Sequence, residues 1–208
     1  MDTFVITIAR GFGSGGKEIG SKIAERFNIP CYESQIFKMA SEYSGLNESL
    51  FEIANEKLKG NLFIKKLTQT PFSKLAEPTE KKFESDNNLF QIQSRIIEEI
   101  AKTTSCVIIG KCADHVLSDY SNVASFYIEA PRAQCVASIM NKLKVSEEEA
   151  NKLIQKTDKY RSDYYNYYTA GKDWTNPINY DMILNSARIG RDKCVDVIED
   201  YIHIKFNK

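Results

Sequence analysis

Residues 4–27 read FVITIARGFGSGGKEIGSKIAERF, and this stretch decides the fold. Its first part, Phe4–Ala9, is apolar on both faces, as is typical of a strand buried in a parallel sheet. Its last part, Lys17–Phe27, repeats apolar residues at helical spacing along one face. Four glycines lie between the two parts, and glycine lets backbone N–H groups approach a ligand closely. The stretch predicts a strand, a glycine-rich loop and a helix in direct succession.

The loop and the first turn of this helix predict a phosphate-binding site. A helix N-terminus presents unpaired N–H groups and the positive end of its dipole to an anion. The spacing Gly11-x-x-x-x-Gly16-Lys17 matches a Walker A loop, in which the lysine reaches the β- and γ-phosphates. We therefore expect the phosphates of ATP to be bound by Gly11, Gly13, Ser14, Gly15, Gly16, Lys17 and Glu18.

Glu18 stands where a Walker A loop carries the serine or threonine that binds Mg²⁺. An acidic side chain there either contacts the metal through water or stabilises the positive end of the helix dipole. The sequence does not decide between these roles. Two other interpretations stay open, a glycine-rich turn with no ligand and a dinucleotide site. The dinucleotide site depends on Glu33 alone as the acid that binds a ribose.

The rest of the chain alternates between strand and helix patterns. Such alternation predicts a parallel sheet with right-handed crossovers, which here is an α/β P-loop NTPase three-layer fold with a five-stranded sheet. The expected strands are 4–9, 30–33, 106–110, 124–129 and 181–185, and the expected helices are 17–27, 88–102, 131–143, one opened by the Ser146-x-x-Glu149 capping box, and 192–204.

The length of 208 residues suits one domain with two insertions. The second and third strands are too far apart for one crossover helix, and so are the fourth and fifth. We expect a single P-loop kinase domain over residues 1–208, with a core of 1–33, 88–143 and 179–208, an acceptor-binding arm of 34–87, and a lid of 144–178.

Net charge, cysteine spacing and the length of apolar runs argue against several classes of function. The 28 basic and 28 acidic residues give no net charge, which argues against binding to nucleic acid polymers or anionic membranes. Five scattered cysteines without a CxxC pair, with two histidines, argue against zinc sites and disulfides and suit a reducing cytoplasm. No apolar run approaches the roughly 20 residues of a membrane span. The oligomeric state, a homodimer included, stays open.

Three segments resemble the cytidylate kinase-like family. They are ITIARGFGSGGKEIG followed by IPCYESQIF, then CVIIGKCADHVL, and the long stretch VSEEEANKLIQKTDKYRSDYYNYYTAGKDWTNPINYDMILNSARIG. The resemblance covers most of the chain outside about residues 55–90. It implies a transferase that uses ATP and Mg²⁺ to phosphorylate a small-molecule acceptor, plausibly a pyrimidine nucleoside monophosphate such as CMP or dCMP.

One segment departs from the family pattern. Cytidylate kinases carry Asp-Gly-Arg-Asp after the third strand, whereas this chain has Ile109-Gly110-Lys111-Cys112. The acid is absent and lysine replaces arginine, so the metal and acceptor contacts of this segment are in doubt. Two alternatives to the kinase of a nucleoside monophosphate follow. One is a non-catalytic nucleotide-binding P-loop protein, and the other is a kinase of a non-nucleotide small molecule.

Phosphoryl transfer needs positive charge where the transition state spreads negative charge. Lys17 is the strongest candidate for a catalytic residue. Lys111 follows the third strand at the rim where open α/β sheets bind ligands. The resemblance places Arg161 among lid arginines that close over phosphates, although a solvated helix face explains it as well. It also places Arg188 and Arg191 in a loop that contacts adenine.

The acceptor is expected near the first and second strands. Arg10 either reaches an acceptor phosphate or forms a structural ion pair, and Arg132 lies either near phosphates or at the surface. Tyr32 and Glu33 follow the second strand, where the acceptor base or ribose lies, although Tyr32 also suits the core.

The candidate carboxylates and tyrosines also have structural interpretations. Asp158 and Arg161 are three residues apart on one helix, so an intrahelical ion pair is favoured over catalysis. Asp114 either holds Mg²⁺ through water or caps a helix over His115–Tyr120, which we favour. Tyr160, Tyr164 and Tyr168 share a helix face, with Tyr165 off it, and this stripe is expected to pack rather than to stack on a base.

Overall fold

The computed structural model describes residues 3–44 and 80–207. The chain divides into two compact units, one formed by residues 1–33 and 97–208 and the other by residues 34–96. Within the described residues, no helix combines the length and the apolar character that crossing a bilayer requires. The first unit holds the sheet and the glycine-rich loop.

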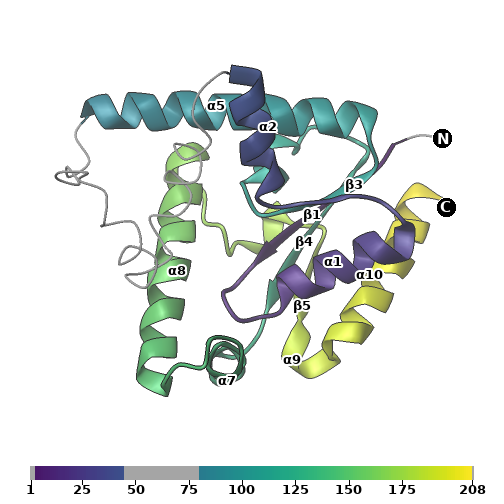
Figure 1. The fold of residues 1–208 in the computed structure, drawn as a ribbon. Coiled ribbons are helices and arrows are strands. Elements are labelled where there is room, and N and C mark those ends of the chain that lie inside the picture. The colour runs from purple at the N-terminus through teal and green to yellow at the C-terminus, as the bar shows by residue number, and fades with distance from the viewer. Residues whose placement is uncertain (1–2, 45–79, 208) are drawn as a thin grey trace. The chain divides into compact units, whose positions relative to one another are not determined.

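A parallel five-stranded sheet forms the centre of the first unit, in the order β2-β3-β1-β4-β5 (Figure 1). Its strands are β1 (Val5–Arg10), β2 (Cys31–Tyr32), β3 (Cys106–Ile109), β4 (Val123–Glu129) and β5 (Met182–Asn185). Because β1 lies in the middle, its end and the ends of its neighbours β3 and β4 share one edge of the sheet. The expected P-loop fold with five parallel strands is confirmed.

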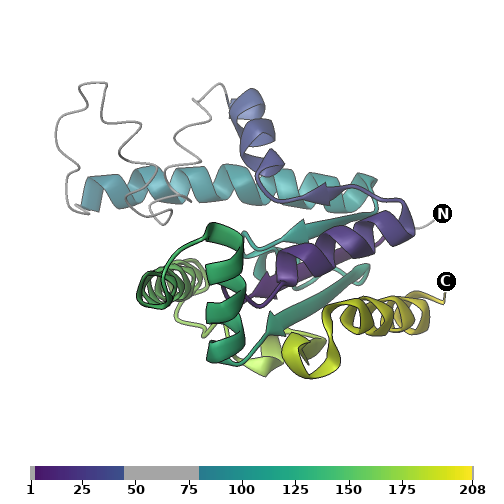
Figure 2. The same ribbon diagram turned by 60° about the horizontal axis from the view of Figure 1, so that its bottom comes forward.

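Helices α1 (Gly16–Phe27) and α10 (Arg191–Phe206) lie side by side over one face of the sheet, as both views show (Figures 1 and 2). The main core lies between them and the strands. Ile19 and Ile23 of α1 and Ile198 of α10 are fully buried there against Ile6 and Ile8 of β1. The apolar face predicted for the first helix is therefore what fixes α1 beneath the glycine-rich loop.

Strand β4 presents alternate side chains to opposite sides, as pleating requires. Phe126 belongs to the core on the α1 side. Tyr127 packs instead against the rings of Trp174 and Tyr180, with centroids 5.5 and 5.3 Å away. These two rings belong to the segment around the short helix η1 (Pro177–Asn179), which leads into β5.

Helices α7 (Arg132–Leu143) and α8 (Glu147–Tyr168) form a second apolar cluster through Val136, Ile139, Ala150 and Ile154. The predicted capping box opens α8: Ser146 Oγ accepts the N–H of Glu149, whose carboxylate accepts the N–H of Ser146. Two four-residue helices complete the first unit, α6 (Ala113–Val116) and α9 (Ser186–Ile189).

The second unit holds α2 (Gln35–Ser44) and most of α5 (Glu80–Thr103). Phe37 and Ala40 of α2 pack on Leu89 of α5, with Ile92 and Ile96 beside them. Helix α5 begins eight residues before the predicted Asn88, within the segment expected to be the acceptor arm. The rest of that predicted arm, residues 45–79, lies outside the described residues.

Candidate active site

The loop after β1 folds back over the first turn of α1. Ser14 closes it, because its N–H and its hydroxyl both donate to the carbonyl of Gly11, at 3.3 and 2.9 Å. Gly13 and Gly15 have φ angles of 94° and 88°, in the left-handed region that favours glycine. The result is a row of N–H groups that donate to no described residue, those of Gly13, Gly15, Gly16 and Lys17.

These N–H groups make the loop suited to an anion. They lie at the N-terminus of a 12-residue helix, where the dipole adds a partial positive charge. The Ser14 hydroxyl donates to Gly11 within the loop, and the Ser14 carbonyl accepts the hydroxyl of Ser186 at 2.6 Å. Ser14 therefore stabilises the loop conformation. The geometry therefore suits an anion at Gly13, Gly15, Gly16 and Lys17, and binding of the ATP phosphates by the expected loop residues stays a prediction.

Lys17 forms an ion pair with Glu33, although 61% of the lysine side chain is exposed. Arg10 approaches the other carboxylate oxygen of Glu33 at 3.2 Å. Burial alone would raise the pKa of Glu33, but the hydrogen bond from Lys17 and the charges of Arg10, Lys17 and Lys111 hold this pKa below its ordinary value. Glu33 is therefore a carboxylate, shared by two cations beside the loop.

A left-handed turn follows β3 next to this pair. Gly110, Lys111 and Cys112 have φ angles of 73°, 65° and 54° in succession. The guanidinium of Arg10 packs against Gly110 so closely that a Cβ there would collide with it. Successive left-handed residues other than glycine are costly and occur where the surroundings enforce them, often in functional sites. The turn places Lys111 where its positive charge helps to lower the pKa of Glu33.

Helix α8 contacts the loop through Asp158 and Arg161. Asp158 Oδ1 accepts the N–H of Phe12 at 2.8 Å, and Arg161 Nη1 donates to the carbonyl of Arg10 at 3.0 Å. The two side chains also pair with each other at 3.4 Å, as their spacing predicts. Burial raises the pKa of Asp158 and lowers that of Arg161 to about 9. Arg161 is thus directed at the loop backbone and the Phe12 ring, whose centroid is 5.6 Å from its guanidinium carbon.

Glu18 is paired with two cations on the helix side of the loop. Its carboxylate lies 2.6 Å from Arg191 and 3.1 Å from Lys22. Burial would raise the pKa of Glu18, but the hydrogen bonds from Lys22 and Arg191 lower it. Arg191 also donates to Ser138 Oγ at 2.9 Å and packs against Gly15, so it joins α10 to the loop.

Within the described residues, the protein alone does not form a complete cage for the Mg²⁺ that the resemblance implies, although this ion usually takes only one or two carboxylates and completes its ligands with substrate phosphates and water. Magnesium prefers oxygen ligands, above all carboxylates. The carboxylates near the loop already hold cations or N–H groups, as Glu18, Glu33 and Asp158 do. Within residues 3–44 and 80–207, no three His, Cys, Asp or Glu side chains gather into a metal-binding group.

Among the described residues, three further predicted side chains make no hydrogen bond to the glycine-rich loop. Tyr32 is half-buried in the edge strand β2, next to Glu33. Arg132 donates to the side chain and the carbonyl of Asn151, at 3.0 and 2.6 Å, and so joins α7 to α8. Arg188 is exposed on α9.

The predicted helix over His115–Tyr120 is wrong, because the helix here is α6, and Asp114 lies inside it. Asp114 is buried and accepts the hydroxyl of Tyr165 at 2.8 Å. Burial raises its pKa to about 6, against the lowering effect of this hydrogen bond. Tyr165, the tyrosine placed off the expected stripe, is the buried one and joins the C-terminal half of α8 to α6.

Sequence reasoning missed Glu129, at the end of β4. A Cβ on Gly11 would lie 2.5 Å from its carboxylate, which accepts the Tyr127 hydroxyl and the Ala130 N–H, both at 2.8 Å. The signal was available, since the last residue of a strand beside β1 reaches the same edge of the sheet. The pairing of Glu18 with Arg191 had no such signal, because 173 residues separate them.

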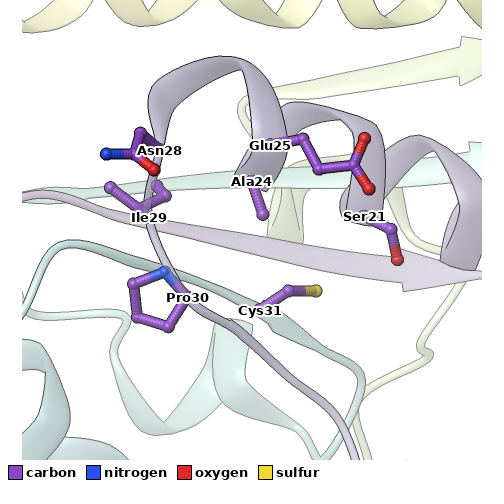
Figure 3. A pocket seen from close by; sticks show the side chains of 7 residues that line it. All are labelled: Ser21, Ala24, Glu25, Asn28, Ile29, Pro30 and Cys31. Carbon is purple, nitrogen blue, oxygen red and sulfur yellow. The ribbon is translucent and has the colours of Figure 1, made fainter.

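A pocket of about 490 Å³ opens at the other end of α1, away from the glycine-rich loop (Figure 3). Among the described residues that line it there is no lysine or arginine, so this lining does not suit phosphate. Burial raises the pKa of Cys31, which makes this thiol a weak nucleophile. The lining residues are Ser21, Ala24, Glu25, Asn28, Ile29, Pro30 and Cys31.

Solved structures share this fold. An uncharacterized protein from Eubacterium ventriosum is 26% identical, covers 96% of this chain and 98% of its own, and has a TM-score of 0.69. A shikimate kinase from Bacteroides thetaiotaomicron is 12% identical, with the same coverages and a TM-score of 0.52. A sugar kinase from Janibacter sp. is 12% identical, covers 97% and 95%, and has a TM-score of 0.55.

No curated protein matches the sequence. The sequence pattern of the cytidylate kinase-like family, however, matches residues 5–188, from the start of β1 to α9. The match includes the glycine-rich loop, the turn after β3 and the whole of α8. The chain therefore belongs to the cytidylate kinase-like family and has its kinase-type P-loop fold.

Proposed function

We propose that this protein transfers the γ-phosphoryl group of ATP to a small acceptor, with CMP or dCMP as the first candidates. The observation that carries the proposal is the row of N–H groups at Gly13, Gly15, Gly16 and Lys17, above the N-terminus of α1. Such a row binds polyphosphate through backbone donors and the helix dipole. Family membership supports the reaction type.

In this proposal Lys17 changes partner. With no phosphate present its ammonium pairs with Glu33. When the donor binds, the ammonium turns to the phosphates, where negative charge builds up in the transition state. Glu33 keeps Arg10 as its partner. The exposure of Lys17 makes this exchange inexpensive, since exposed ion pairs contribute only about 0–1 kcal/mol.

The acceptor is proposed to bind beside Glu33. The phosphate of a nucleoside monophosphate needs cations to bind it. Arg10 and Lys111 are near enough to Glu33 for their charges to lower its pKa, so both are candidates to bind this phosphate. Glu33 itself favours a second candidate, a small alcohol. A carboxylate held there is suited to accept a hydrogen bond from a hydroxyl and so to orient it toward the phosphorus. Nucleoside monophosphates and small alcohols are therefore the two acceptor classes to compare.

The experiment measures ADP formation from ATP, in buffer containing Mg²⁺, with CMP, dCMP, other nucleoside monophosphates and small alcohols as acceptors. With the accepted substrate, Lys17→Ala is expected to lower kcat at least about a hundredfold, the effect of losing one preorganised donor. Lys22→Ala is the control, because Lys22 lies on the same helix but pairs with Glu18 and Asp192. Circular dichroism checks that both variants are folded.

Turnover by Lys17→Ala equal to that of the wild type would refute the proposed function. Nucleotide binding without acceptor-dependent ADP release across both classes would also refute it and assign a non-catalytic nucleotide-binding protein. Selectivity for alcohols over nucleoside monophosphates would select the second acceptor class.

A further inference from the structure

Two side chains of helix α8 form hydrogen bonds with the backbone of the glycine-rich loop, one on each side of Gly11. The carbonyl before this glycine, that of Arg10, accepts from Arg161, and the N–H after it, that of Phe12, donates to Asp158. The same two side chains pair with each other across one turn of the helix. A single intrahelical pair thus contacts two consecutive peptide groups of the loop.

These contacts are partly shielded from water. The side chains of Asp158 and Arg161 are only 29% and 20% exposed. Two other pairs on α8 are different: Lys152–Glu148 and Lys159–Asp163 have both partners more than 60% exposed, and each pair joins two residues of the same helix. Hydrogen bonds between a charged group and a shielded backbone group are the stronger kind, and losing one partner leaves the other unsatisfied.

The contacts leave the anion-binding groups free. Asp158 takes the N–H of Phe12, whereas the N–H groups of Gly13, Gly15, Gly16 and Lys17 donate to no described residue. A carboxylate placed on any of those four would compete with phosphate. The pair therefore fixes the start of the loop without blocking the part that faces a ligand.

We propose that Asp158 and Arg161 are positioning residues, which hold the Arg10–Gly13 backbone so that the following N–H groups converge on the donor phosphates. Arg161 acts through the loop backbone rather than as a cation on the phosphates. The position of α8 and the affinity for nucleotide are thereby coupled. This inference rests on the proposed role of the loop in binding ATP.

The test compares ADP binding, by isothermal titration calorimetry, in the wild type and four α8 variants. Asp158→Ala is expected to raise the Kd for ADP about tenfold, the weight of one charge-assisted hydrogen bond. Asp158→Asn keeps an oxygen for the Phe12 N–H and is expected to stay within about threefold of the wild type. Arg161→Met is expected to behave as Asp158→Ala. Asp163→Ala is the control, because among the described residues that carboxylate pairs with Lys159 alone.

Amide hydrogen exchange of the ligand-free protein tests the contact without nucleotide. The N–H group of Phe12 is expected to exchange at least about tenfold faster in Asp158→Ala than in Asp163→Ala, while those of the β1 interior stay unchanged. A role in general stability alone would raise exchange throughout the first unit and leave the Kd of the folded protein unchanged. That result would overturn the inference.

The two proposals fail in different ways. If the wild type binds no ADP, the proposed function fails, and the exchange rates still decide whether α8 holds the loop. If the wild type binds ADP and Asp158→Ala binds it equally well, only the positioning role fails. Weak binding by Asp158→Asn, equal to that of Asp158→Ala, would also overturn it, because charge rather than the Phe12 contact would then be responsible.

Discussion

Gly13→Ala tests the glycine-rich loop most directly, and the chain offers a matched control. Gly13 and Gly171 have almost the same φ, 94° and 93°. A Cβ on Gly13 would lie 2.7 Å from the carbonyl oxygen of Cys135 and 3.0 Å from its Cα, whereas a Cβ on Gly171 would meet nothing within 4 Å. The two substitutions share the backbone strain and differ in the collision.

The structure gives the size of each effect. Alanine in the left-handed region costs about 1–2 kcal/mol, of which a stiffer unfolded chain returns about 0.4–1 kcal/mol. Gly171→Ala should therefore lower the free energy of unfolding by about 1 kcal/mol. Gly13→Ala adds an overpacked contact with backbone atoms that cannot rotate away, worth about 1–3 kcal/mol more. We expect a total loss of about 2–4 kcal/mol.

Urea denaturation followed by circular dichroism measures both losses, and calorimetric titration with ADP measures binding. The Kd for ADP should rise at least about tenfold in Gly13→Ala, because the loop must move away from Cys135 and its N–H groups move with it. It should stay unchanged in Gly171→Ala. Equal losses of stability in the two variants, or unchanged ADP binding in Gly13→Ala, would refute the reasoning.

Two further predictions concern buried or shared carboxylates. Glu33→Gln removes the carboxylate that competes with phosphate for Lys17. The Kd for ADP, measured by titration calorimetry, should therefore fall by up to about fivefold, which corresponds to the free energy of a surface ion pair. An unchanged or higher Kd would contradict this. The pKa of Asp114 is about 6 in the folded state, above its ordinary 3.8, so the folded state binds more protons between these values. The wild type should therefore lose up to about 3 kcal/mol of stability relative to Asp114→Asn as the pH rises from 4 to 7, and parallel stability curves of the two proteins would contradict this.

The sequence predicted the features that depend on neighbouring residues. The apolar runs gave all five strands, and the spacing of glycines and Lys17 gave the loop. The Ser146–Glu149 capping box gave the start of α8 to the residue. Each of these features depends on residues that are close together in the sequence, where periodicity and local hydrogen bonding determine the structure.

Features that depend on distant residues could not be predicted in the same way. The spacing of Asp158 and Arg161 showed that they pair, but not that the pair faces Phe12, 146 positions earlier. The left-handed turn after β3 carries a glycine only at its first position, so nothing local announced it at Lys111 and Cys112. Tertiary packing imposes both features, and single-sequence patterns do not record which surfaces meet.

The ion pairs around the loop also bear on what gives the site its affinity. Lys17 and Arg10 share Glu33, Arg191 holds Glu18, and Arg161 holds Asp158. A polyphosphate that recruits one of these cations must first separate it from a carboxylate, so its net gain from that cation is small. The backbone N–H groups of the loop bear no such penalty, because no described residue competes for them. They are therefore expected to supply most of the binding energy for the donor. Moving them, as Gly13→Ala does, is for this reason a sharper test of the site than neutralising any single charge.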